Sequence, residues 1–184
     1  MKALLLPLLL LGSAACDAQA PAAEGQRRPL TAAPARPLPA LTGRVVDNAD
    51  VLGAAAEAEL TARLAALEKA TTDQLVVVTV PGLDGEAIED LGLRLGNGWG
   101  VGQKGLDNGV LLIVSPADQK ARIEVGKGLE GLLTDRRAAR IMAKQVVTNC
   151  RQGHCERAIA EGVDAIAALL RSDRKRPQPK RRPA

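Results

Sequence analysis

The pattern of hydrophobic and polar positions changes its period along the chain, and its clearest part lies near the middle. Residues 110–114 are apolar without a break, which is typical of a strand covered on both faces. Over 120–125, apolar and charged residues alternate, which predicts a strand with one polar face. Turn-forming residues at 115–118 separate the two segments, so we expect a hairpin. A glycine-rich loop over 126–131 follows it.

Apolar residues three and four positions apart predict four helices, and one further apolar run predicts another strand. Leu60, Leu64 and Leu67 mark the first helix. The run over 74–80 ends at Pro81 and predicts a buried strand. We expect helices over residues 53–71, 86–95, about 135–149 and about 156–170, with Thr134 as the N-cap of the third.

The segment 96–109 lies between the second helix and the hairpin, and it shows no period. It contains six glycines and the single tryptophan of the chain, Trp99. We expect a loop here. Trp99 belongs either to a mobile lid or, in the plainer interpretation, to a structural anchor.

The order of elements indicates the fold class. Helix, strand, helix, strand, strand, helix and helix follow one another, and apolar strands need cover on both faces. The sequence therefore predicts an α/β fold, a three-layer α/β/α sandwich with a small mixed central sheet.

Charge is distributed unevenly along the chain. The formal net charge is +4, and subtracting +2 for residues 1–40 and +6 for residues 171–184 leaves −4 for residues 41–170. The body is mildly acidic, which argues against a nucleic-acid-binding protein, because such a protein needs basic residues clustered on its folded face. We expect one domain over 41–171 and a basic, disordered tail over 172–184.

The first residues resemble an export signal. Lys2 and a short apolar run precede small residues and Cys16, and the run is too short to span a bilayer. The signal covers residues 1–20. Either Cys16 becomes the lipidated N-terminus of a bacterial lipoprotein, or ordinary cleavage follows Ala20.

A Pro- and Ala-rich linker over 21–40 would then hold the domain away from a membrane. We expect an exported protein on the periplasmic side of a bacterial membrane, held there by a lipid anchor.

The cysteines other than Cys16 form a pair. Cys150 and Cys155 flank a short turn between two helices, so a disulfide is expected in an oxidising compartment. A zinc site that includes His154 is the rival interpretation, but it would have only three ligands.

Several short motifs together resemble the TPM domain family, over about residues 42–170. They are Val46-Asp47-Asn48-Ala49 with Leu52, Trp99-Gly100-Val101-Gly102, Asp107-Asn108-Gly109-Val110-Leu111-Leu112, Arg122-Ile123-Glu124-Val125-Gly126-Lys127-Gly128-Leu129-Glu130-Gly131, and Asp135.

The resemblance implies an α/β/α sandwich that is exported and tethered to a membrane. Some members resemble acid phosphatases of the thylakoid lumen, and others resemble metal-binding or accessory modules of membrane proteins. The chain departs from the family pattern at three places: Asp118-Gln119-Lys120, Lys127, and the turn with Cys150 and Cys155.

The candidate site residues are oxygen ligands. Carboxylates without a His or Cys cluster suit a hard cation, Ca²⁺ first and Mg²⁺ second. The plain alternative is that these residues only form turns and helix starts. The candidate metal ligands are Asp47, Asp107, Glu130 and Asp135, and Asn108, Glu124, Arg122 and Lys127 are possible additional ligands or phosphate contacts.

Two functions fit these residues. The first is a metal-binding accessory module that docks on a membrane protein or membrane complex. The second is a metal-dependent acid phosphatase that hydrolyses phosphomonoesters, although the sequence shows no Ser, Cys or His nucleophile motif.

Overall fold

The protein forms a three-layer α/β/α sandwich. The structure is a computed structural model, and it describes residues 37–172 except for the side chain of Gln145. The central sheet is mixed, as the sequence predicts. Its four strands lie in the order β1-β2-β3-β4, with β4 antiparallel to β3 and the other neighbours parallel. They are β1 (Val45–Asp47), β2 (Gln74–Thr79), β3 (Gly109–Ser115) and β4 (Lys120–Val125).

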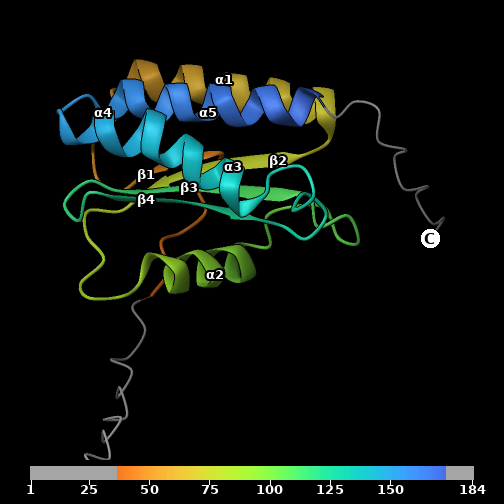
Figure 1. Ribbon diagram of the computed structural model, residues 1–184, viewed down its shortest axis with the longest axis horizontal. Coiled ribbons are helices and arrows are strands. Elements are labelled where there is room, and N and C mark those ends of the chain that lie inside the picture. The colour runs from red at the N-terminus through yellow and green to blue at the C-terminus, as the bar shows by residue number, and fades with distance from the viewer. Residues whose placement is uncertain (1–36, 173–184) are drawn as a thin grey trace, which may run out of the picture. The chain divides into compact units, whose positions relative to one another are not determined.

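Helices cover both faces of this sheet (Figure 1). One face carries α2 (Ile88–Trp99), and the other carries α1 (Ala54–Thr71) and α5 (Cys155–Ser172). The second group also includes α3 (Asp135–Ile141), a π-helical turn (Met142–Val147) and α4 (Thr148–Arg151), which follow one another directly. No helix of this described part has the length and apolar character needed to cross a membrane.

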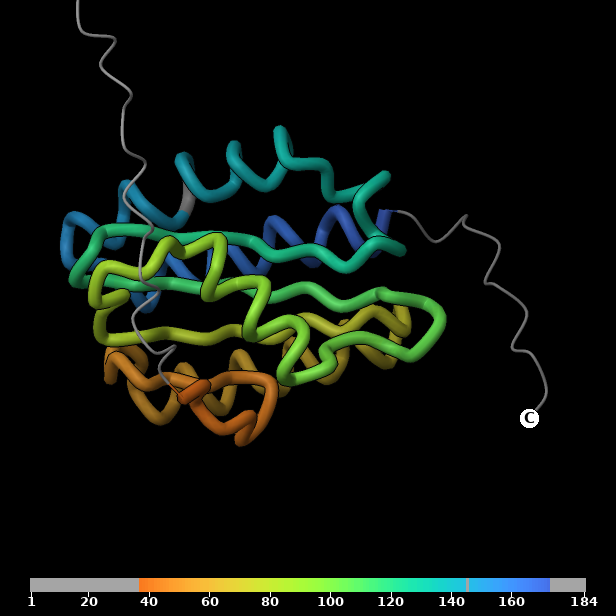
Figure 2. Tube along the Cα trace, turned by 90° about the horizontal axis from the view of Figure 1, so that it is seen from below, coloured from red at the N-terminus to blue at the C-terminus, as the bar shows by residue number. Residues whose placement is uncertain are grey.

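Strand register defines two opposite edges of the sheet. Asp47 pairs with Thr79, which pairs with Val114, so β1, β2 and β3 end together at what we call the carboxyl edge. Gln74 pairs with Gly109 at the other end, where β4 finishes, and we call this the amino edge. Figure 2 shows β2, β3 and β4 side by side between these two edges.

Two apolar cores follow from the alternation of side chains along the strands. Val77, Leu112 and Ile123 pack with α1 and α5, whereas Val78 and Ile113 pack with α2. The predicted polar face of β4 is also present, because Arg122 and Glu124 lie on the α2 side.

The predicted loop over 96–109 is wrong at its start, because α2 continues to Trp99. Glycine is a poor helix former, but it allows close packing. A Cβ atom at Gly92 would lie 2.9 Å from the Glu124 carboxylate, so α2 approaches β4 there through a position without a side chain. The helix ends at Gly100, whose φ of 60° is left-handed.

Trp99 anchors the incoming chain. Its indole N–H donates to the Pro39 carbonyl oxygen at 2.9 Å, and Leu38 packs against the α2 core. The structure therefore agrees with the interpretation of Trp99 as an anchor. It also places Leu38 and Pro39, expected at the end of the linker, against the folded domain.

One short strand was not predicted, and the predicted N-cap residue of α3 is in place but does not use its side chain. The apolar residues Val45 and Val46 belong to strand β1, for which the sequence pattern predicts no element. Thr134 is the N-cap residue of α3, but its side chain makes no capping hydrogen bond.

The cysteine pair forms the predicted disulfide. Cys150 in α4 and Cys155 at the start of α5 are joined, with their Cα atoms 4.0 Å apart. The bond closes the turn between the two helices at the carboxyl-edge end of the domain, where both residues line a surface hollow with Val51 and Pro116.

Candidate ligand-binding cleft

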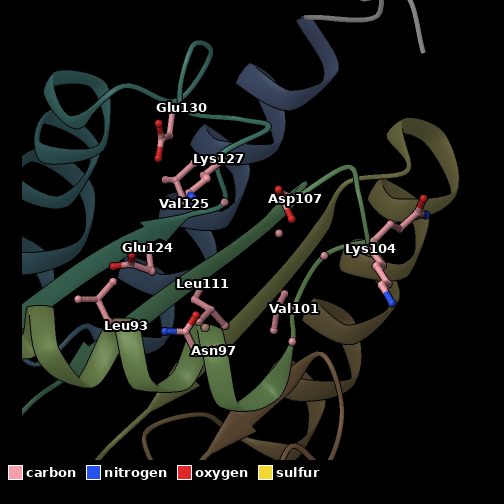
Figure 3. Close-up of a pocket in the computed structure, with 16 residues that line it drawn as sticks. Leu93, Asn97, Val101, Lys104, Asp107, Leu111, Glu124, Val125, Lys127 and Glu130 are labelled. Carbon is pink, nitrogen blue, oxygen red and sulfur yellow. The ribbon is translucent and has the colours of Figure 1, made fainter. Parts of the chain in front are cut away.

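A cleft of about 590 Å³ opens at the amino edge of the sheet (Figure 3). It is formed by the second half of α2, the loop between α2 and β3, the loop after β4, and the ends of β3 and β4 that these loops join. We call it the amino-edge cleft. Its lining residues are Leu93, Gly96, Asn97, Gly100, Val101, Gly102, Gln103, Lys104, Asp107, Gly109, Leu111, Glu124, Val125, Gly126, Lys127 and Glu130.

Glycines bring the two loops of the cleft into direct backbone contact. The Gly126 N–H donates to the Gly109 carbonyl at 2.8 Å, and the Gly128 N–H donates to the Asp107 carbonyl at 3.0 Å. A Cβ atom at Gly126 would overlap the Asp107 carbonyl oxygen, and one at Gly128 would overlap the Leu106 carbonyl oxygen. These glycines let one loop approach the other closely.

Asp107 and Glu130 line the same cleft, as the predicted hairpin requires. Both are exposed, and Figure 3 draws them on separate loops with Lys127 between them. Among residues 37–172, neither carboxylate forms an ion pair. Asp107 also has a φ of 47°, a left-handed conformation that is uncommon outside glycine.

Asp47 does not belong to this cleft. It ends β1 at the carboxyl edge, separated from Asp107 by roughly 20 Å of strand. Its carboxylate accepts hydrogen bonds from the Thr79 hydroxyl and, at 2.8 Å, from the Leu52 N–H. Asp47 therefore fastens the segment after β1.

Asp135 is also outside the cleft, whose lining does not include it. It is the exposed first residue of α3. The four predicted ligands thus do not converge. In the part of the chain that the structure describes, no three His, Cys, Asp or Glu side chains come close enough together to hold a metal ion.

Asn108 has a different role from the one expected of a ligand. Its side chain is 5% exposed, and its Nδ2 donates to the Thr72 carbonyl at 2.7 Å. Its Oδ1 accepts from the Gln103 N–H at 2.8 Å. One end of the amide therefore bonds within the loop, and the other bonds to the turn after α1.

Glu124 and Arg122 bind each other under α2. The Arg122 Nε donates to Glu124 Oε2 at 2.8 Å, and a second nitrogen of Arg122 lies 3.8 Å from Glu89. Glu124 still lines the cleft, but its charge is balanced. Arg122 is therefore engaged with protein carboxylates rather than presented to a phosphate.

Sequence reasoning missed several residues of the cleft. Lys104 lines it as well as the predicted Lys127, and Leu93 forms part of its α2 wall although the residue is 52% exposed. Leu93 could have been noticed as an apolar residue outside the buried face of its helix. Lys104 lies in a segment without period, where no pattern identifies a site.

Two carboxyl groups elsewhere have pKa values below their ordinary range. Burial opposes ionisation of Glu68, but hydrogen bonds from Arg44 and Gln74 and the charge of Arg44 together lower its pKa. The pKa of Asp118 is lowered chiefly by the Ser115 hydroxyl and then by the Leu83 N–H. Neither group lines the cleft, so these shifts belong to the scaffold.

A family model described as the TPM domain matches residues 45–169 of the chain. A comparison with curated proteins finds no match. Among solved structures, the N-terminal domain of a protein from P. gingivalis is 33% identical with a TM-score of 0.68, over 73% of this chain and 85% of that one.

Two more distant structures share the fold. The BA42 protein from the psychrophilic bacterium Bizionia argentinensis is 19% identical with a TM-score of 0.58, over 66% of this chain and 82% of that one. The N-terminal domain of a protein from Corynebacterium glutamicum is 13% identical with a TM-score of 0.56, over 73% and 84% of the two chains.

Proposed function

The chain belongs to the TPM domain family, and we propose that it acts as a divalent-cation-binding accessory domain of a membrane protein or membrane complex. The observation that supports this most is the presence of the Asp107 and Glu130 carboxylates in one cleft, on two loops fastened together by glycines. Ca²⁺ is the cation that this arrangement suits best, and Mg²⁺ is the second choice.

The oxygen donors of the cleft fit a hard cation in an open site. Two carboxylates from separate loops supply part of the six to eight oxygens that Ca²⁺ takes, and backbone carbonyls and water supply the rest. Mg²⁺ demands stricter octahedral geometry and keeps more of its water. With so few charged ligands, we expect a dissociation constant of about 10⁻⁴ to 10⁻³ M, the range of extracellular calcium modules.

Thermal melting tests this proposal. The protein is melted in EDTA and then in rising Ca²⁺ or Mg²⁺, and a cation at a hundred times its Kd should stabilise the fold by ~2.7 kcal/mol. For a domain of this size that is a shift of several degrees. The shift should be lost in Asp107→Ala and in Glu130→Ala.

Asp135→Ala is the matched control, because this exposed carboxylate lies outside the cleft. It should keep the full cation-dependent shift. If no divalent cation raises the melting temperature of the parent protein, or if Asp135→Ala loses the shift as completely as Asp107→Ala, the proposed site is wrong.

The lysines of the cleft favour a second candidate, a metal-dependent acid phosphatase. Lys104 and Lys127 line the same cleft as the carboxylates, so they could neutralise a phosphomonoester bound there. The test is hydrolysis of p-nitrophenyl phosphate at acidic pH. Activity that persists when Asp107→Ala and Glu130→Ala are combined would come from a contaminating enzyme rather than from this cleft.

Tethering to a membrane rests on Cys16, which lies outside the described residues. If Cys16 is lipidated, Cys16→Ser should move the protein from the membrane fraction of the cell to the soluble fraction. An unchanged distribution would instead support ordinary cleavage after Ala20. If the protein is anchored, crosslinking in the membrane fraction would identify its partner among membrane proteins.

A further inference from the structure

The loop that carries Asp107 is fastened to the turn between α1 and β2, which does not line the cleft. Besides the bonds of its side chain to Thr72 and Gln103, Asn108 accepts a hydrogen bond at its backbone oxygen from the Gln74 N–H at 3.0 Å. Its Nδ2 also lies 3.4 Å from the Asp73 carboxylate. The residue next to Asp107 therefore both closes the loop and joins it to the turn.

Gln74 forms a second fastening of the same loop. Its Oε1 accepts from the Gly102 N–H at 2.8 Å, and its Nε2 donates to Glu68 at 3.0 Å. Glu68 is held in turn by Arg44, whose Nη2 lies 2.7 Å from its carboxylate. A continuous series of hydrogen bonds thus runs from Arg44, the residue before β1, to Gly102, which lines the cleft.

The backbone conformation of Asp107 is one that needs such contacts to hold it. A residue with a Cβ atom at a φ of 47° is in an uncommon conformation, and such conformations persist when surrounding contacts hold them. The two fastenings hold the loop at Gly102, Gln103 and Asn108. If they were released, Asp107 could return to a commoner conformation and its carboxylate would leave its present place.

We propose that Asn108 and Gln74 are positioning residues of the amino-edge cleft: they hold the Asp107 carboxylate where, together with Glu130, it binds a divalent cation. This inference rests on the proposed function for its cation. Neither residue contacts the cation. They set its affinity, and the choice between Ca²⁺ and Mg²⁺, by fixing the separation of two carboxylates that come from different loops.

The test compares Asn108→Ala and Gln74→Ala with the parent protein in two measurements. Calorimetric titration gives the Kd for Ca²⁺ and for Mg²⁺, and amide hydrogen exchange without cation reports the loop at Gly102 and Gln103. We expect Ca²⁺ affinity to fall by about 10- to 100-fold, as for other partners that orient metal ligands. The ratio of Ca²⁺ to Mg²⁺ affinity should change, and both amides should exchange faster.

Gln152→Ala is the matched control. Its side chain is exposed in the turn between α4 and α5, far along the chain from the cleft loops. It should change neither affinity nor the exchange of Gly102 and Gln103. If Asn108→Ala does not fold, Gln74→Ala carries the test, because Gln74 is only partly buried.

The outcomes separate this inference from the proposed function. Variants whose loop amides exchange faster, but which bind both cations as the parent does, would overturn the positioning role. A parent protein that binds neither cation would contradict the proposed function, and the positioning role is then decided by exchange alone. In that case, unchanged exchange at Gly102 and Gln103 would overturn it too.

Discussion

Gly126 packs directly on the carbonyl oxygen of Asp107, with no room between them for a Cβ atom. The contact joins the loop after β4 to the loop before β3, next to the backbone hydrogen bond from Gly126 to Gly109. The shape of the amino-edge cleft therefore depends in part on the absence of a side chain at position 126.

Replacing Gly126 with alanine should separate the two loops. Because the added methyl group meets backbone atoms that cannot turn aside, we expect Gly126→Ala to cost about 1–3 kcal/mol of the free energy of unfolding, the usual range for overpacking. Urea denaturation of the variant measures this cost. Cation binding should be weakened at the same time, because Asp107 moves with its loop.

Gly131→Ala is the control for this substitution. Gly131 is an exposed glycine of the same loop, and a Cβ atom there meets nothing within 4 Å. We expect a change within about 0.5 kcal/mol, as for ordinary surface substitutions. Equal costs at positions 126 and 131 would contradict the backbone contact.

The sequence was sufficient for the elements with a long or regular pattern. The continuous apolar run of β3 and the alternation in β4 were enough to predict a hairpin, and the hairpin placed Asp107 and Glu130 at one edge. β1 was missed because three residues are too few for a period. The end of α2 was missed because Gly96 and Gly98 have low helix propensity, whereas the contact of Gly98 with Leu38 is not visible in any local pattern.

The candidate site could be predicted only in part, for a related reason. The edge at which Asp47 lies depends on the parallel pairing of β1 with β2, which no local pattern contains. The role of Asn108 likewise depends on Thr72, a contact over 36 positions of the chain. Residue types alone therefore suggested four carboxylate ligands, whereas the fold places only Asp107 and Glu130 in the same cleft.

The lowered pKa of Asp118 predicts a pH-dependent contribution to stability. A carboxyl group whose pKa is depressed in the folded state stabilises that state above its unfolded pKa of about 3.9. This contribution is lost as the pH falls through the lower folded value. Since the Ser115 hydroxyl and the Leu83 N–H favour the ionised form, the parent protein should be more stable than Asp118→Asn at pH 6.

Thermal melting of the parent and of Asp118→Asn between pH 2 and pH 7 checks this. The asparagine oxygen can still accept both hydrogen bonds, so the comparison isolates the charge. We expect the difference in melting temperature to shrink as the pH falls below the unfolded pKa of about 3.9 and to disappear once Asp118 is protonated in the folded state. A difference that stays constant over the whole range would show that charge is not the cause.

The disulfide should stabilise the domain by a modest amount. It closes a loop of only a few residues, since Cys150 and Cys155 are five positions apart, and the chain-entropy model then gives about 2 kcal/mol. Dithiothreitol should therefore lower the melting temperature of the parent protein. The double variant Cys150→Ser with Cys155→Ser should melt at this lower temperature whether or not dithiothreitol is present, and a response of that variant to the reductant would contradict the assignment.

The effect of Gly162→Ala on stability should change sign when Val146 is replaced by alanine. Gly162 lies in α5, and a Cβ atom there would come within 2.8 Å of Val146 Cγ2, a fully buried and rotationally restricted side chain. Gly162→Ala should therefore destabilise the parent protein, although alanine is the better helix former by about 1 kcal/mol. In a Val146→Ala background the clash is absent, so the same substitution should stabilise the protein by about that amount. Urea denaturation of the parent, the two single variants and the double variant gives both differences. An identical effect of Gly162→Ala in the two backgrounds would show that the close approach of α5 to the π-helical turn does not limit position 162.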